Sequence, residues 1–141
     1  MKMTELVDIL HSGRHSLVVA KTAVSTYDGR GVADLFRLLH EEPDVIAGAR
    51  IADKVVGKGA AALMAVAKAA EVYADVISKP ALDMLVGTGI KTTYGVLAEH
   101  IINRAGTDIC PLEKRCMKCA TPEECLTEIT TFVNEMKAKQ K

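Results

Sequence analysis

The sequence has no net charge, because 18 basic side chains (Lys and Arg) are balanced by 18 acidic ones (Asp and Glu). A protein that holds nucleic acid without sequence preference needs a basic field for the phosphate backbone. The absence of such a field argues against general nucleic-acid binding. A net charge near zero also removes one safeguard against association between copies, which weakly favours a homo-oligomer.

The sequence also lacks a long apolar run and an apolar export signal. Its longest apolar run, from Gly59 to Ala67, is mostly alanine and is far shorter than the ~20 residues that span a membrane. The N-terminus continues from Met1 as an amphipathic stretch with acidic residues, unlike a signal peptide. We therefore expect a cytoplasmic protein without a membrane segment, in which cysteines are more often thiols or metal ligands than disulfides.

What the sequence does contain is the pattern of one α/β domain, in which short apolar runs alternate with segments of helical periodicity. The expected strands are 16–20 and 23–27 (a hairpin), 45–51, 72–77 and 92–97. The expected helices are 3–10, 32–39, one that begins at the N-cap Asp53, 80–86, and one that begins at Thr121-Pro122. This order implies a three-layer α-β-α fold with a mixed sheet. We assign residues 1–109 to the α/β domain and residues 110–141 to a Cys-rich segment and C-terminal helix packed on it.

Three segments together resemble a known family. They are Gly48-Ala-Arg-Ile-Ala-Asp-Lys-Val-Val-Gly-Lys-Gly-Ala-Ala-Ala-Leu63, Val72-Tyr-Ala-Asp-Val-Ile-Ser78, and Asn103-Arg104 followed by Thr107-Asp-Ile-Cys-Pro-Leu-Glu113. In this order they are similar to a small family of uncharacterised prokaryotic proteins, a domain of unknown function. The resemblance covers roughly residues 4 to 113. It implies a fold similar to that of cytidine deaminases and very little about activity.

The zinc-deaminase pattern is missing from the positions where that resemblance would place it. Zinc deaminases need a His or Cys ligand close to a catalytic Glu, and then Pro-Cys-x-x-Cys at the next helix start. The first position holds Asp53-Lys54, and the second keeps Pro80 but holds Ala81 and Met84 where the cysteines should be. Alanine cannot bind zinc and methionine binds it poorly. Hydrolytic deamination by that mechanism is therefore excluded on chemical grounds.

Two lysines near one expected helix start, together with Ser78, form the candidate ligand site. Lys54 and Lys58 follow Asp53, and backbone N–H groups at a helix N-terminus attract anions, which lysines reinforce. Ser78 ends the strongest expected strand at the same sheet edge, where it either lines this site or caps the helix that begins at Pro80. The functional interpretation is a pocket for a phosphate or carboxylate, and the structural one is a helix cap with solvated lysines and glycines for packing. Asn103 and Arg104 are further candidates for an anion contact or an ordinary salt bridge.

The candidate metal ligands are cysteines rather than histidines. The histidines lack paired ligand spacing, so we expect surface or loop positions for His11, His15, His40 and His100. The cysteine spacing is Cys-x5-Cys-x2-Cys-x5-Cys, formed by Cys110, Cys116, Cys119 and Cys125. Four thiolates would fill all four coordination positions of a zinc ion or hold an iron–sulfur cluster. Such a site would fix the C-terminal segment in place. Free or redox-responsive thiols and disulfides remain the alternatives.

The sequence thus predicts a small-molecule-binding domain without zinc-deaminase residues. The predicted ligand is an anionic small molecule, of a class that includes nucleotide-like compounds, at Asp53, Lys54, Lys58 and Ser78. One alternative is an enzyme of unassigned chemistry in a remade cleft, with Lys54 or Cys110 as the reactive group. Another is a four-cysteine metal protein or an iron–sulfur redox protein in which the cysteine cluster is the function.

Overall fold

The computed structural model describes residues 2–29, 32–103 and 105–139. Within them a five-stranded sheet has the order β2-β1-β3-β4-β5. Its strands are β1 (Leu17–Ala20), β2 (Val24–Tyr27), β3 (Arg50–Val56), β4 (Glu71–Ser78) and β5 (Lys91–Ala98). The strand β1 is antiparallel to β2 and β3, whereas β3, β4 and β5 are parallel. The predicted α/β fold with a mixed sheet is confirmed.

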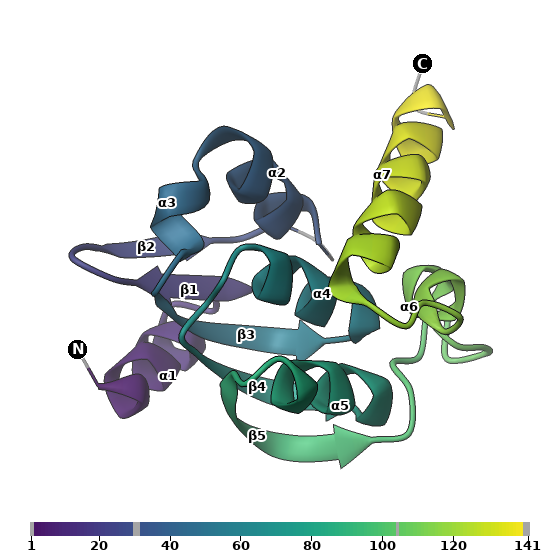
Figure 1. Cartoon of the computed structure of the whole chain (residues 1–141). Helices are drawn as coiled ribbons and strands as arrows, with labels where there is room; N and C mark the ends of the chain where they lie inside the picture. The colour runs from purple at the N-terminus through teal and green to yellow at the C-terminus, as the bar shows by residue number, and fades with distance from the viewer. Residues whose placement is uncertain (1, 30–31, 104, 140–141) are drawn as a thin grey trace.

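Helices cover both faces of the sheet, as the three-layer prediction requires (Figure 1). One face is covered by α1 (Met3–Ser12), whose Leu6 and Leu10 pack against Val18 and Ala52. The other face carries the larger core, under α2 (Ala33–Glu41), α3 (Pro43–Ile46), α4 (Lys58–Val66) and α5 (Lys79–Gly87). Parallel strands joined by α4 and α5 place both helices on the same face because such crossovers are right-handed.

The C-terminal helices add to the larger core. They are α6 (Pro111–Cys116) and α7 (Pro122–Lys139), and α7 leaves the body of the fold beside α4 (Figure 1). Leu112, Cys116, Cys125 and Ile129 belong to the same buried cluster as α4. The α4 helix is buried almost all round because its first turns are glycine and alanine, which lets other helices approach it closely.

The capping signals were predicted correctly at two helices. Ser78 is the N-cap of α5, and its Oγ accepts a hydrogen bond from the Ala81 backbone N–H at 3.3 Å. At α7 the Thr121 Oγ1 accepts from the Glu124 N–H at 3.2 Å. The Glu124 carboxylate in turn accepts from the Ala120 N–H at 3.0 Å, one residue earlier than an ideal capping box.

The predicted elements between residues 43 and 57 were wrong in part. The expected strand 45–51 is divided between helix α3, which has Pro43 in its first turn, and strand β3. The two are separated by Gly48, whose φ of 76° makes the turn. Asp53 is not a helix cap, because it lies inside β3, opposite Leu17 of β1 and Ala74 of β4. The β-branched Val55-Val56 prolongs the strand, and the helix cap is Gly57.

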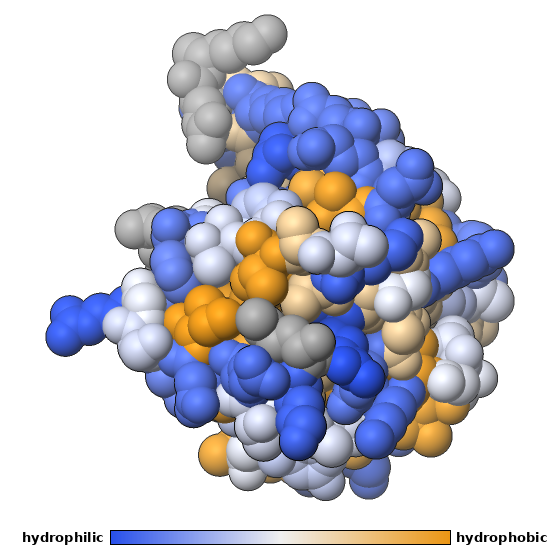
Figure 2. Space-filling view, turned by 90° about the vertical axis from the view of Figure 1, so that its left-hand side faces the viewer, coloured by the Kyte–Doolittle hydropathy of each residue, from blue (hydrophilic) through white to orange (hydrophobic). Residues whose placement is uncertain are grey.

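The surface that carries α1 and the turn between β1 and β2 (Figure 1) mixes hydrophobic and hydrophilic side chains (Figure 2). Figure 2 shows hydrophobic atoms there in small areas between hydrophilic ones. Within the residues that the structure describes, no helix is both long and apolar enough to cross a membrane.

Candidate functional site

A buried carboxylate lies where three parallel strands end. The Glu113 side chain of α6 is only 1% exposed. Its Oε1 accepts hydrogen bonds from the Lys58 backbone N–H, at 3.1 Å, and from the Ser78 hydroxyl. Its Oε2 accepts one from the Ile101 backbone N–H. The carboxylate therefore occupies the N-terminus of α4, a position that attracts anions through free N–H groups and the helix dipole.

One glycine allows α6 to reach this position. A Cβ atom on Gly59 would lie 2.8 Å from a side-chain methyl of Leu112, which is too close. A Cβ atom on Gly57 would lie 3.5 Å from the Glu113 carboxylate, an ordinary van der Waals distance. Gly59 has no positive φ, so its role is close packing: it makes room at the start of α4 for the helix that carries Glu113.

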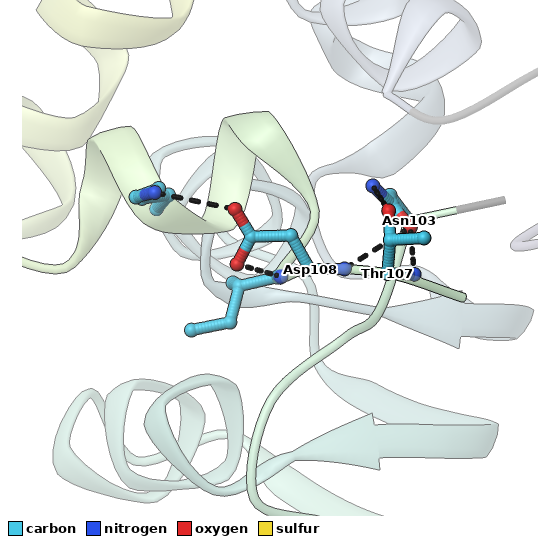
Figure 3. Close-up of polar contacts among 5 residues, drawn as sticks. Asn103, Thr107 and Asp108 are labelled. Atoms are coloured by element: carbon cyan, nitrogen blue, oxygen red, sulfur yellow. Dashed lines mark hydrogen bonds and ion pairs between the residues drawn. The ribbon is translucent and has the colours of Figure 1, made fainter. Parts of the chain in front are cut away.

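Asn103 makes several of the hydrogen bonds that close the loop between β5 and α6 (Figure 3). The Asn103 Oδ1 accepts from the Thr107 N–H at 3.0 Å, and the Asn103 N–H donates to the Asp108 carbonyl at 2.8 Å. Asp108 in turn accepts from Lys114 of α6 at 3.3 Å, and the pKa of Asp108 is lowered by the Ile109 N–H and by Lys114. Asn103 thus organises the loop that leads into α6. Arg104, the other predicted anion contact, lies outside the described residues.

A cavity of about 410 Å³ lies beside Glu113, at the carboxyl edge of the sheet. Its volume is within the range of about 300–1,000 Å³ typical of small-molecule sites. Residues from the junctions after β3, β4 and β5 line it together with the α6–α7 connection. The lining residues with titratable groups are Lys58, Lys79, Asp83, Glu99, His100 and Cys119.

The charges that line this cavity are mixed. Lys79 is exposed, and its ammonium has no hydrogen bond or ion pair with any described residue. Lys58 is half-buried, and its ammonium donates to the carbonyls of Met117 and Cys119 at 3.2 and 2.6 Å. Asp83 and Glu99 supply carboxylates on the same lining. The cavity therefore offers two ammonium and two carboxylate groups within one small volume.

His100 also lines this cavity, and its ring is not fully satisfied. The ring atom Nδ1 is buried and has no hydrogen-bond partner among the described residues. A buried polar atom without a partner costs free energy, about 1–3 kcal/mol in proteins. His100 is the second residue after β5 and lies in a loop, as predicted, but it is half-buried and its place in the cavity lining was not predicted.

The four predicted ligand-binding residues do not form one site. Lys58 lines the cavity. Ser78 lies next to it but is fully buried, and its hydroxyl is used by Glu113 and the α5 cap. Asp53 pairs with Ala74, which is four residues before Ser78 on β4, so Asp53 lies ~13 Å from Ser78 along the strands. Lys54 is exposed on β3 and is absent from the cavity lining.

Asp53 is an unusual carboxyl group in its own right. It is 8% exposed, and its Oδ1 is 3.4 Å from the Val55 backbone N–H. Burial, opposed only by the backbone N–H groups of Val55 and Lys54, raises the pKa of Asp53 to about 8. A side chain enclosed in this way is a poor contact for an outside ligand.

Three of the four cysteines lie close together, with Cys125 in contact with each of the other two. The Cys125 thiol hydrogen-bonds with the thiols of Cys116 and Cys119. The hydrogen bond with Cys125 lowers the pKa of Cys116, whereas burial raises the pKa of Cys119 to about 11. The hydrogen bond with Cys116, together with burial, raises the pKa of Cys125. These thiols join α6, the α6–α7 connection and α7 under the Lys58 ammonium.

Cys110 is separate from this thiol cluster. It precedes α6, whereas Cys116 ends that helix, so the two lie roughly 9 Å apart along the helix axis. Across residues 2–29, 32–103 and 105–139, no three His, Cys, Asp or Glu side chains are arranged to hold a metal ion. The structure thus supports neither a four-cysteine cluster nor a preformed metal site, and metal binding stays a prediction.

Sequence reasoning missed Glu113, the residue at the centre of the site, and several residues that line the cavity. Glu113 was noticed only as the end of a family segment, because no helix was expected over residues 111–116. Lys79 and Glu99 each follow a strand that was predicted correctly. The rule that ligands bind beyond the carboxyl ends of parallel strands selects both of them.

Comparisons with known proteins agree on one family. The model of the family TM1506, described as a domain of unknown function (DUF1893), matches residues 5–133. A crystal structure of a DUF1893 family protein (TM1506) from Thermotoga maritima is 25% identical, with a TM-score of 0.85. That match covers 92% of this chain and 88% of the Thermotoga protein. No curated protein matches the chain. The family match includes Cys116, Cys119 and Cys125, which lie beyond the predicted limit of the resemblance at residue 113.

Proposed function

The chain belongs to the TM1506 family, a domain of unknown function, and we propose that it binds a small molecule with an anionic group in the cavity beside Glu113. The observation that carries this proposal is the lining of that cavity, in which Lys58, Lys79 and His100 meet from three separate strand ends. The two ammonium groups would hold the anionic group. The unpartnered Nδ1 of His100 would gain the hydrogen bond that it lacks in the protein alone.

The acidic residues of the cavity narrow the class of ligand. Asp83 and Glu99 would repel a simple anion but would accept hydrogen bonds from an amino group. The helix N-terminus of α4 does not contribute a free anion site, because Glu113 already accepts from the Lys58 N–H. The ligand class that fits is therefore a small molecule with both an anionic group and an amino group, such as an aminopurine nucleotide.

The test is a titration followed by two-dimensional ¹H–¹⁵N NMR, including the ring nitrogens of His100. AMP carries a phosphate and an exocyclic amine, whereas inorganic phosphate and adenosine each carry only one of them. We expect AMP to bind more tightly than either and to shift the His100 Nδ1 resonance. Lys79→Met should weaken AMP binding, and the matched variant Lys137→Met, in the exposed last turn of α7, should not. Shifts that occur elsewhere, or none at millimolar concentrations of all three probes, would contradict the proposal.

The likeness to cytidine deaminases stays a prediction. What supports it is the order of the elements and the cavity between the starts of α4 and α5. Those starts read Gly57-Lys58-Gly59 and Lys79-Pro80-Ala81, without the His, Cys and Glu that zinc deamination needs. The alternative enzyme is not favoured either, since neither Lys54 nor Cys110 lines the cavity.

A metal centre is the second candidate function, and the contact of Cys125 with both Cys116 and Cys119 is the observation behind it. Binding of zinc or an iron–sulfur cluster by four cysteines would require Cys110 to move toward this cluster. The test is the zinc and iron content of protein purified without oxygen. One bound metal per chain that Cys116→Ser and Cys119→Ser both remove would support the centre, and a folded metal-free protein would contradict it.

A further inference from the structure

The strand β5 is an exposed edge. It has eight residues, pairs only with β4, and is last in the strand order. In Figure 1 it forms the lower border of the sheet, and no described element lies beyond it. Three large apolar side chains on it are exposed, namely Tyr94 at 41%, Val96 at 57% and Leu97 at 45%. A long, apolar edge with unpaired backbone groups is a template for another strand.

The features that normally protect such an edge are missing from β5. Natural edge strands are short, contain proline or inward-pointing charges, or are covered by a loop. The opposite edge of this sheet, β2, follows that rule with only four residues. In contrast, β5 has no proline, and its only charged residue is Lys91 at the first position. We therefore expect that another strand covers this edge in the folded protein.

The sequence of β5 is complementary to itself. A two-fold axis perpendicular to the sheet makes one residue of an antiparallel pair lie opposite its own copy. With Gly95 at that centre, Tyr94 lies opposite Val96 of the second copy, and Lys91 lies opposite Glu99, the residue directly after the strand. A pair of an aromatic and a β-branched residue, or a pair of opposite charges, stabilises a sheet when its members lie opposite each other on neighbouring strands. Because of the two-fold symmetry, each of these pairs occurs twice in the dimer. If the two-fold axis passed through Tyr94 or Val96 instead, Lys91 would no longer lie opposite Glu99.

We propose that two copies of this chain associate through β5, antiparallel and centred on Gly95, to form one continuous sheet across the dimer. A Cβ atom at Gly95 would lie 2.9 Å from the Asp75 carbonyl of β4, so the pairing of β5 with β4 already favours glycine at this position. Because Glu99 also lines the cavity, the two cavities would lie near the ends of the shared interface.

Charge reversal tests both the surface and the register. The measurement is sedimentation velocity at low salt over a range of protein concentrations, since salt screens exposed pairs. The unaltered protein should show a monomer–dimer equilibrium. Lys91→Glu or Glu99→Lys alone places like charges opposite each other twice and should weaken the dimer about tenfold. The double variant Lys91→Glu with Glu99→Lys should restore it, and Lys137→Glu on the exposed end of α7 is the control.

Other outcomes overturn the proposal in distinct ways. A protein that stays monomeric at every concentration would leave the β5 edge free for a different partner. A dimer that neither single variant weakens would place the interface elsewhere. Loss of the dimer without rescue by the double variant would refute the register. Val96→Glu changes an exposed side chain, so it should fold; if it leaves the dimer intact, β5 is not the contact.

Discussion

The hydroxyl of Ser78 donates a hydrogen bond to the carboxylate of Glu113, 35 residues later in the chain. This contact joins the last residue of β4 to the short helix α6. The same carboxylate oxygen accepts from the first residue of α4, and the other oxygen accepts from Ile101 after β5. One side chain therefore ties together the ends of three parallel strands, which is where the candidate ligand cavity lies.

Loss of the Glu113 carboxylate should destabilise the protein strongly. Glu113→Ala leaves two backbone N–H groups and the Ser78 hydroxyl without their acceptor in a buried place, which should cost ~3 kcal/mol or more. Glu113→Gln retains one acceptor oxygen and should cost less. Urea unfolding followed by circular dichroism measures both. The exposed Glu41→Ala variant on α2 is a control with an expected change below ~0.5 kcal/mol.

A double-mutant cycle isolates the Ser78–Glu113 contact from the rest. Ser78→Ala alone should cost ~1–2 kcal/mol, since it removes both this hydrogen bond and the α5 cap. If the two residues interact as the structure shows, the double variant should cost less than the sum of the singles. Additive effects would mean that Glu113 is stabilised by the backbone donors alone.

The sequence predicted most of the fold because its elements follow local rules. Periodicity found the hairpin, β4 and β5, and capping residues found the starts of α5 and α7. It failed between residues 43 and 57 because Val45-Ile46 and Val55-Val56 are both β-branched runs, and only tertiary pairing decides which becomes strand. Asp53 was a good N-cap by type, yet the pairing of β3 with β1 placed it inside the sheet.

The candidate site was predictable only at the level of the sheet edge. Lys58 and the junction at Ser78-Lys79 lie at the predicted edge because parallel strands end together there. The contribution of Glu113 was not predictable from spacing, since it comes from a helix that closes over the edge from 35 residues away. Likewise, the cysteine spacing did not reveal that α6 separates Cys110 from the other three.

Asp53→Asn should stabilise the protein, and more so at high pH. The unfolded chain ionises Asp53 near pH 3.8, whereas the folded protein retains its proton until about pH 8. Between these values the folded state binds more protons, so stability contributed by this group falls as pH rises and then levels off. We expect Asp53→Asn to gain ~2 kcal/mol near pH 8 and little at pH 4.

Thermal unfolding at several pH values measures the Asp53 effect, with Asp8→Asn on exposed α1 as the control. The control should follow the unaltered protein at every pH. A stability difference for Asp53→Asn that is the same at pH 4 and pH 8 would show that the carboxyl group is ionised in the fold, contrary to its burial.

The cysteines should react with iodoacetamide in two groups. Cys110 is partly exposed and should be alkylated first in the folded protein. Cys116 and Cys125 are fully buried, and the pKa of Cys119 is raised to about 11, so little reactive thiolate forms there at pH 8. Mass spectrometry of digested protein after increasing times gives the order. Protection of all four, released by a chelator, would instead reveal the four-cysteine metal centre.

Gly59→Ala should destabilise the protein although alanine favours helices. The added methyl group would meet the Leu112 side chain at 2.8 Å and push α6, with Glu113, away from the start of α4. We expect a cost of ~1–3 kcal/mol, as for other overpacked sites. Gly87→Ala at the end of α5 is the matched control, because nothing lies within 4 Å of its added Cβ. It should gain ~0.5–1 kcal/mol from helix propensity. If Gly59→Ala also stabilised the protein in urea unfolding, α6 would not pack on α4 as closely as the structure shows, and the Glu113 contacts would lose their basis.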